Sequence, residues 1–223
     1  MAQLIITIDG PAGVGKSTIS RRLAEHLDAI HLDTGAMYRA VTLAAMRANI
    51  DLTDPVQIRE LIGQTEFHFE ADHDDMRVWI DNREVTNEIR DPQVTEKVKH
   101  VASMDTIRHE LVEWQQRFAN DYPRIVTEGR DQGTVVFPNA TVKFFLTADP
   151  SERARRRQLQ WKESGIKVPL EQILQDIETR DASDRTRATG PLVPAENAVI
   201  VDTTRLSIDE VIEVLLTHIP ETA

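Results

Sequence analysis

The sequence contains no cysteine, so neither a disulfide bond nor thiolate chemistry is available to this chain. Positive charge is outweighed: 26 Lys and Arg stand against 37 Asp and Glu, which gives a formal net charge of −11. That balance argues against nucleic acid or an anionic membrane as a partner. The sequence has no apolar run long enough for a membrane span, and a strand is expected within a few residues of Met1. We therefore expect a cytoplasmic protein without a signal peptide.

Arginine is nevertheless concentrated locally. One group lies between Arg153 and Arg157, a second between Arg180 and Arg187, and Arg130 stands in a glycine-containing segment. An acidic protein that gathers arginine in a few places is expected to hold a small, highly charged anion, because guanidinium groups bind phosphate with paired hydrogen bonds.

A run of β-branched residues, Ile5–Ile8, ends in a glycine-rich turn. The segment Gly10–Ser17 fits the phosphate-binding pattern G-x-x-x-x-G-K-[ST] at every fixed position, and a helix is predicted directly after it. Backbone N–H groups of such a turn cradle phosphate at the positive end of the helix dipole. We expect Lys16 to reach the β- and γ-phosphates of ATP and the Ser17 hydroxyl to bind Mg²⁺. The predicted nucleotide-binding residues are Gly10, Pro11, Ala12, Gly13, Val14, Gly15, Lys16, Ser17 and Thr18.

Predicted strands alternate with helices along most of the chain. Strands are expected near residues 4, 29, 124, 141 and 198, and each leads into a helix or a long crossover. The pattern predicts an α/β fold with a five-stranded parallel sheet and helices on both faces. Such sheets bind ligands beyond the carboxyl ends of their strands. The expected helices are 18–25, 36–49, 55–62, one from Pro92, 105–119, one from Pro150 with a capping box between Asp149 and Glu152, one from Pro169 to near Arg180, and one capped by Ser207 and Glu210.

One segment interrupts this alternation. Residues 67–69 and 76–80 alternate with period two around a polar turn at 72–75, which predicts an antiparallel hairpin. Together with its neighbouring helices it is expected to form an insertion of about 40 residues in a single domain, residues 1–223. His68, His73 and the acids of the turn could be metal ligands, but a solvated turn is the favoured interpretation.

A bound nucleotide could serve as a switch, a motor or a phosphoryl donor. The N-K-x-D sequence typical of guanine-specific switches is absent, whereas the many arginines suit phosphoryl transfer. An ionised phosphate acceptor needs no base, but an alcohol acceptor would need one, for which Asp33 is the candidate. Asp33 could equally support Thr34 and Gly35 or a magnesium-bound water. The alternatives are a kinase of a small metabolite alcohol and a nucleotide-switched binding module whose hairpin recruits a protein.

Four segments together resemble the bacterial cytidylate kinases, a family of nucleoside monophosphate kinases with a P-loop. They are Gly10–Ser17, Leu32–Arg39, Gly129–Pro138 and Arg180–Arg187, and the resemblance extends over nearly the whole chain. It implies transfer of the γ-phosphoryl group of ATP, with Mg²⁺, to CMP or dCMP, forming CDP or dCDP and ADP. It also implies a monophosphate-binding region at 36–103, including the insertion at 64–103, and a lid region at 150–188. We expect a monomer.

The resemblance also implies roles for individual residues. Arg39, Arg130 and Arg187 match arginines that bind the monophosphate. Asp184 matches a carboxylate that binds the sugar, and Arg180 lies beside it. Asp131 and Arg108 match groups that recognise cytosine, and Thr34 is expected near the substrate. Arg153, Arg156 and Arg157 belong to the lid, and Lys16, Arg130, Arg187, Arg153 and Arg157 are the expected catalytic residues. Lys99 stands where the family usually has a serine that helps to hold the base. Either Ser103 or a neighbour replaces it, or recognition depends more on Arg108 and Asp131, so the preference between cytosine and uracil is left open.

Overall fold

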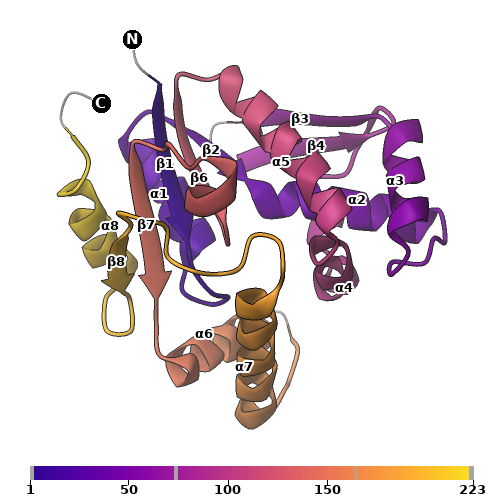
Figure 1. The fold of residues 1–223 in the computed structure, drawn as a ribbon. Helices are drawn as coiled ribbons and strands as arrows, with labels where there is room; N and C mark the ends of the chain where they lie inside the picture. Colours follow the sequence, from indigo (N-terminus) through magenta and orange to yellow (C-terminus); the bar gives the residue numbers. More distant parts are fainter. Residues whose placement is uncertain (1–2, 73–74, 164, 221–223) are drawn as a thin grey trace.

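The computed structural model describes residues 3–72, 75–163 and 165–220, and its centre is a five-stranded parallel sheet (Figure 1). The strand order is β2-β6-β1-β7-β8, which confirms the predicted fold class. The register pairs the last residue of β1 with that of β6, so these two strands end side by side. The strands are β1 (Leu4–Asp9), β2 (Ile30–Asp33), β6 (Arg124–Gly129), β7 (Val142–Thr147) and β8 (Val199–Asp202).

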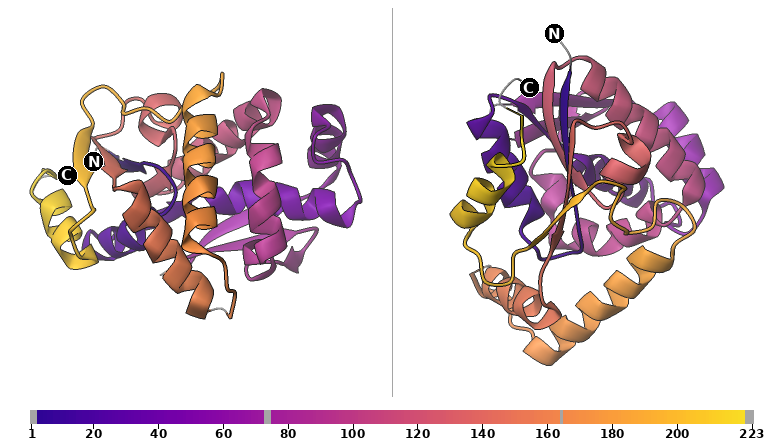
Figure 2. Two further views of the ribbon diagram at one scale, coloured as in Figure 1. Left: turned by 90° about the horizontal axis from the view of Figure 1, so that it is seen from below. Right: turned by 60° about the vertical axis from the view of Figure 1, so that its left-hand side comes forward.

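Helices cover both faces of the sheet, as Figure 2 shows from two further sides. On one face α1 (Lys16–His26) and α8 (Ile208–Leu216) enclose a core that includes Ile6, Ile8 and Leu23. The second core lies on the other face, beneath α5 (Asp105–Asn120), and continues among α2 (Thr34–Arg47), α3 (Pro55–Gln64) and α4 (Pro92–Ala102). Burying aliphatic side chains on both faces is what a parallel sheet of β-branched strands requires.

Aspartates determine where several helices begin. Asp33, Asp54 and Asp91 each accept hydrogen bonds from backbone N–H groups in the first turn of the helix that follows. These helices are α2 (Thr34–Arg47), α3 (Pro55–Gln64) and α4 (Pro92–Ala102). Because Asp33 caps α2, that helix starts two residues earlier than predicted. The capping box between Ser207 and Glu210 is confirmed.

The predicted hairpin is also confirmed, as part of a small antiparallel sheet beside α2. It contains β3 (Phe67–Asp72), β4 (Asp75–Ile80) and a short third strand, β5 (Arg83–Glu84), which the sequence did not indicate. A 3₁₀ turn at Glu88–Arg90 leads from this sheet to α4. His73 and Asp74, in the predicted turn, lie outside the described residues.

Helices α6 (Pro150–Glu163) and α7 (Leu170–Thr186) lie across the carboxyl ends of the strands (Figures 1 and 2). Two predictions were wrong here. Asp149 does cap α6, because its Oδ1 accepts from the Ser151 N–H at 2.8 Å, but the reciprocal half of the capping box is missing: the Asp149 N–H donates to Thr204 Oγ1 and Glu152 accepts from Arg156. Helix α7 continues six residues beyond Arg180, so residues 181–186 are helical and not a separate charged segment.

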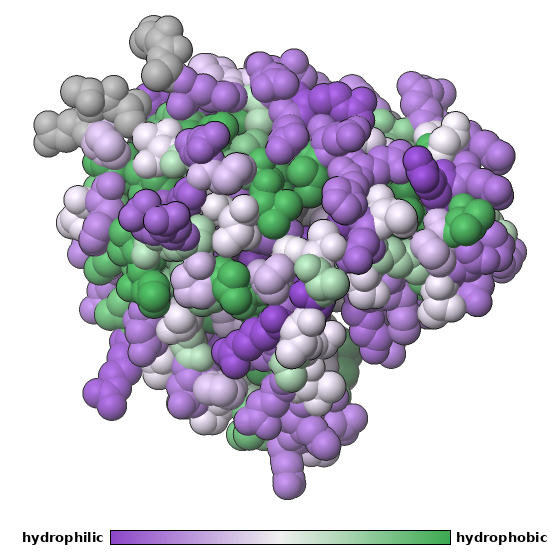
Figure 3. All heavy atoms as spheres, viewed as in Figure 1, coloured by the Kyte–Doolittle hydropathy of each residue, from purple (hydrophilic) through white to green (hydrophobic). Residues whose placement is uncertain are grey.

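Hydrophilic side chains predominate on the face of the molecule shown in Figure 3, with hydrophobic ones interspersed between them. Among the described helices, none combines the length and the apolar character that crossing a bilayer would demand.

Candidate active site

A cavity of about 460 Å³ opens beyond the carboxyl ends of the strands, between the P-loop, the first turn of α2, one side of α4, and helices α6 and α7. It brings together sequence segments that are far apart in the chain. The sequence-predicted residues that line it are Ala12, Gly13, Gly15, Lys16, Ser17, Thr18, Thr34, Arg39, Arg108, Arg130, Asp131, Arg157, Arg180, Asp184 and Arg187. Gly10, Pro11, Val14 and Arg153 do not line it.

The P-loop end of the cavity is built from tightly packed backbone. Gly10 has a φ of +150°, and a Cβ at this position would lie 2.3 Å from the Leu146 carbonyl oxygen, so no side chain fits. Lys16 is buried, and its Nζ donates to the Pro11 carbonyl oxygen at 2.9 Å. Burial, followed by the positive charge of Arg130, lowers the pKa of Lys16 to about 7. A phosphate anion beside Lys16 would favour its charged form.

Sequence reasoning missed the part that Glu128 plays next to the P-loop. The Ser17 hydroxyl donates to Glu128 Oε1 at 2.7 Å, and Glu128 is only 8% exposed. The signal was present: Glu128 lies near the end of β6, the strand that pairs with the P-loop strand β1. A hydroxyl and a carboxylate are the hard oxygen ligands that Mg²⁺ prefers. Because the described residues contain no group of three or more His, Cys, Asp or Glu suited to a metal, the remaining ligands would be phosphate oxygens and water.

A second missed carboxylate ties the P-loop strand to the segment after β6. Asp9 accepts hydrogen bonds from the backbone N–H groups of Gln132 and Gly133 at 2.9 and 2.8 Å. Burial raises the pKa of Asp9 to about 6. These bonds hold the π-helical turn Gln132–Val136, and with it Asp131, against the end of β1.

Basic and acidic side chains alternate in the part of the cavity that Arg130, Asp184 and Arg187 line. Arg130 Nε lies 3.0 Å from Asp184 Oδ2, and Arg187 Nη1 lies 3.7 Å from Asp184 Oδ1. Burial alone would raise the pKa of Asp184, but Arg130 and Arg180 hold it below its usual range. Burial, then the charge of Arg130, lowers the pKa of Arg180 to about 10. This crowding of cations suits a second anion.

Arg39 lines the same cavity from α2, and Asp33 holds it there. Arg39 Nη2 lies 2.8 Å from Asp33 Oδ2, and Arg90 approaches the same oxygen at 3.5 Å. Burial acts to raise the pKa of Asp33, but the charges of Arg39, His31 and Arg90 keep it below its usual range. A carboxylate paired in this way is a weak proton acceptor.

Arg108 and Asp131, the residues matched to cytosine recognition, form a buried ion pair beside the cavity. Arg108 Nη1 also donates to the Ala102 carbonyl oxygen at 3.0 Å, and the Arg108 guanidinium lies 5.7 Å from the centre of the Tyr38 ring. Burial raises the pKa of Tyr38 to about 12, so the ring stays neutral. The pair offers a donor and an acceptor side by side, which suits the polar edge of a base.

The wall that α4 contributes consists of Thr95, Val98 and Ala102. Lys99 is exposed and does not line the cavity. Ser103 does not line the cavity either, and its hydroxyl donates to the His100 carbonyl oxygen at 2.7 Å. Thr95, Val98 and Ala102, and not Ser103, are therefore the neighbours of Lys99 that face the cavity and could take the place of the expected serine.

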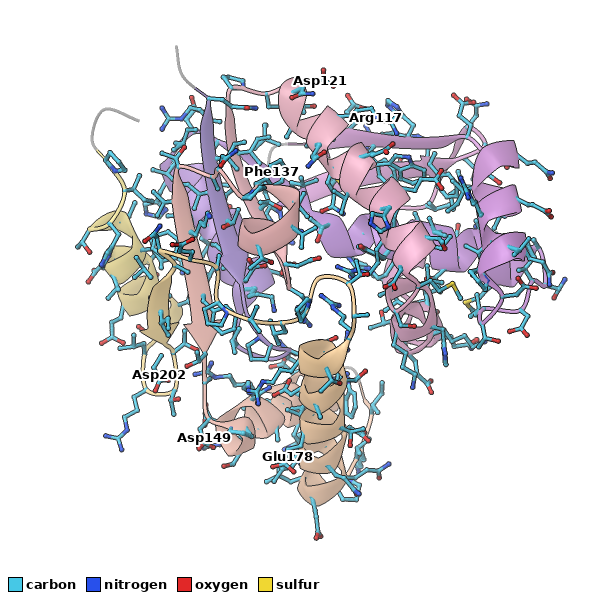
Figure 4. The ribbon with its side chains drawn as sticks, viewed as in Figure 1. Arg117, Asp121, Phe137, Asp149, Glu178 and Asp202 are labelled. Carbon is cyan, nitrogen blue, oxygen red and sulfur yellow. The ribbon has the colours of Figure 1, made fainter. Side chains whose placement is uncertain are left out.

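The three expected lid arginines of α6 have different surroundings. Arg157 lines the cavity and lies 4.8 Å from the centre of the Trp161 ring. Arg156 donates to the Thr203 carbonyl oxygen at 2.7 Å, while Arg153 is 2% exposed. A second, more open cavity is lined by Thr147, Ala148, Asp149, Asp202, Thr204, Arg205 and Leu206, of which Figure 4 labels Asp149 and Asp202.

The glycine-rich phosphate cradle with its lysine, on a parallel sheet and facing a set of arginines, defines a P-loop kinase. The cytidylate kinase family model matches residues 6–221, and the chain belongs to this family. It is 46% identical to a cytidylate kinase of Desulforamulus reducens over 96% of both chains. It is 44% identical to one from Rhodococcus jostii, with 99% and 96% of the two chains covered. A crystal structure of an uncharacterised Eubacterium ventriosum protein shares the fold alone, with a TM-score of 0.53 and 14% identity over 97% of each chain.

Proposed function

We propose that this kinase transfers the γ-phosphoryl group of ATP to CMP or dCMP, forming CDP or dCDP and ADP. The observation that carries the proposal is the shared cavity, in which the P-loop faces Arg39, Arg130 and Arg187. Phosphoryl transfer requires two phosphate groups to be placed in line and their charge neutralised, and little else from the protein. The names of the related cytidylate kinases support CMP as the acceptor.

The donor end would bind ATP through the backbone N–H groups of residues 10–18. Lys16 would leave the Pro11 carbonyl oxygen for the β- and γ-phosphates, where its charged form is favoured. Ser17 and Glu128 fit a Mg²⁺ ion, Ser17 directly and Glu128 directly or through water. When bound, Mg²⁺ would neutralise charge on the phosphate oxygens.

At the acceptor end, Arg39, Arg130 and Arg187 would hold the monophosphate, and no general base is required because the attacking phosphate oxygen is already ionised. Arg157 would approach the transferring phosphoryl group from α6. The ion pairs of Asp33 argue against the alternative in which this carboxylate activates an alcohol. Asp33 would instead hold Arg39 in position.

The nucleoside would lie between α4 and α7. Arg108 and Asp131 would bind the polar edge of cytosine, while Asp184 with Arg180 would bind the sugar and Thr34 would lie near the substrate. We further propose that residues 36–103 form the monophosphate-binding region, with the insertion at 64–103, and that residues 150–188 form a lid within a single domain.

A monomer in the cytoplasm is part of the same proposal. Light scattering of the purified protein at micromolar concentration tests the monomer, and fractionation of the host cells tests the location.

A coupled assay of ADP formation tests the reaction. CMP, dCMP, UMP, AMP and GMP are offered separately with ATP and Mg²⁺, and CMP and dCMP are expected to give the highest kcat/KM. Omission of Mg²⁺ with excess chelator is expected to abolish turnover. Equal slow hydrolysis with and without every acceptor would indicate the nucleotide-switched binding module instead.

A further inference from the structure

Arg153 is a buried arginine that links three separate parts of the chain. Its Nη1 donates to the Ala12 carbonyl oxygen in the P-loop at 3.1 Å, and its Nε donates to the Ala148 carbonyl oxygen after β7 at 3.1 Å. Its Nη2 donates to Asp181 Oδ2 on α7 at 2.6 Å. With its side chain only 2% exposed, Arg153 is held in one place by these three acceptors.

The P-loop backbone lies directly against this side chain. Gly13 has a φ of +83°, and a Cβ at that position would lie 3.1 Å from the Arg153 Cβ. Any larger residue at position 13 would be strained by this positive φ and would require α6 to shift by a few tenths of an ångström at Arg153. Arg153 is therefore packed against the phosphate cradle itself, although it does not reach the cavity.

At its other end the link reaches the helix that carries part of the acceptor site. Asp181 is buried. It lies between Arg180 and Asp184 in the sequence, and both of these residues line the cavity. Ala154, Ile173 and Ile177 form a small apolar core that joins α6 to α7. Because a helix is stiff over one turn, holding Asp181 in place also fixes where Arg180 and Asp184 lie relative to the P-loop.

We propose that Arg153 is a positioning residue that, through Asp181, sets the separation between the donor phosphate cradle and the acceptor-binding side chains of α7. This inference rests on the proposed function, and it replaces the expectation that Arg153 contacts the transferring phosphate. A residue that acts in this way changes the alignment of two bound substrates without touching either one, and small misplacements of this kind reduce phosphoryl transfer strongly.

The main test variant replaces both partners, Arg153→Met with Asp181→Leu, because exchanging a buried ion pair for apolar side chains of similar size preserves folding better than removing one partner. Arg155→Ala is the matched control, since Arg155 is an exposed arginine on the same helix. We expect kcat/KM for CMP to fall by at least about tenfold in the double variant, while the Kd for ATP, titrated without CMP, changes by less than about threefold.

A second measurement does not depend on activity. The chain has no cysteine, so Glu25→Cys on α1 and Glu178→Cys on α7 allow two spin labels to be attached without a background signal. Both glutamates are exposed, and Figure 4 labels Glu178 on α7. Pulsed electron resonance is expected to give one narrow distance for the labelled parent protein and for the Arg155→Ala control. In the double variant the distribution should broaden or shift.

Identical kinetic constants and label distances in the double variant and the control would overturn the proposal, because the pair would then only fill space. An equal loss of affinity for ATP and for CMP would also overturn it, since Arg153 would be acting on the donor cradle alone. If the parent protein fails to use CMP, the proposed function fails, while the label distance still tests the link. Should the double variant not fold, Arg153→Lys keeps the charge but cannot reach all three acceptors, and unchanged constants and distances would contradict the proposal.

Discussion

The two ends of the cavity are built in different ways. The donor end consists mainly of backbone from one short segment, residues 12–18, together with the Lys16 side chain. The acceptor end consists of side chains that α2, α5, α7 and the end of β6 each contribute separately. A site made of backbone depends on a few glycines at fixed spacing, whereas a site made of side chains depends on the topology that brings distant residues together.

The two ends also differ in how their charges are satisfied without substrate. At the acceptor end, Arg39 is paired with Asp33, Arg130 with Asp184, and Arg108 with Asp131. At the donor end Lys16 has a carbonyl oxygen as its acceptor and a lowered pKa. We therefore expect the donor end to gain charge when its ligand binds and the acceptor end to rearrange existing ion pairs.

The largest effect is expected at the donor end. Lys16→Ala should lower kcat/KM by about 10³-fold, or about 4 kcal/mol of transition-state stabilisation, because the charge that neutralises the transferring phosphate is lost. Thermal unfolding should be unchanged or shifted slightly upward, since a buried lysine is costly to desolvate. Lys167→Ala, an exposed lysine, is the control. Near-normal activity of Lys16→Ala would contradict the role of the P-loop.

At the acceptor end, Arg187→Ala should lower kcat/KM for CMP by about 10²-fold while changing the Kd for ATP by less than about twofold. Arg187 faces Asp131 and Asp184 and donates to the Gly190 carbonyl oxygen at 2.5 Å. None of these partners belongs to the P-loop segment. The exposed Arg185 provides the control variant, Arg185→Ala. Equal losses for the two substrates would show that the two ends are not separate sites.

The difference between local pattern and long-range topology also explains which features could be predicted from the sequence. The five strands, most helix starts and the P-loop were correct because each depends on local pattern: β-branched runs, Asp-Pro pairs and glycine spacing. Residues 181–186 were missed as helix because Asp and Ser have weak helical propensity, and the buried Arg153–Asp181 pair that overrides it is a tertiary contact. Glu128 and Asp9 were missed as site residues because their partners, Ser17 and the 132–133 backbone, are more than 100 residues away in sequence.

The pKa of Lys16 gives a prediction that only the donor end should show. Above pH 7 the ligand-free Lys16 is largely neutral, whereas bound ATP favours its charged form, so binding takes up a proton. Affinity for ATP should therefore fall as pH rises, by up to about tenfold per unit between pH 7.5 and 8.5. Calorimetric titration in buffers of different ionisation enthalpy measures the proton directly. Lys16→Met should remove this pH dependence, and its persistence would assign the proton to another group.

Asp33→Asn separates phosphate chemistry from alcohol chemistry at the acceptor end. We expect kcat/KM for CMP to fall by only about fivefold, because Asn can still cap α2 but holds Arg39 less firmly. A carboxylate that served as the general base would be needed in every turnover. Its loss would lower kcat/KM by about 10²-fold or more, which is the usual contribution of a general base. Such a loss, with normal folding by circular dichroism, would revive the alcohol kinase interpretation.

The smallest effect is expected for Lys99→Ser, which introduces the serine that the resemblance to the family implies at this position. Because Lys99 is exposed and the cavity wall of α4 is formed by Thr95, Val98 and Ala102, the KM for CMP should change by less than about twofold. The KM for UMP, measured in parallel, should change equally little. Val98→Ala, which alters the wall itself, serves as the comparison and should have the larger effect. If Lys99→Ser instead tightens CMP binding by about tenfold, α4 must turn toward the base when the acceptor binds. The acceptor end would then change its backbone as well as its ion pairs on binding.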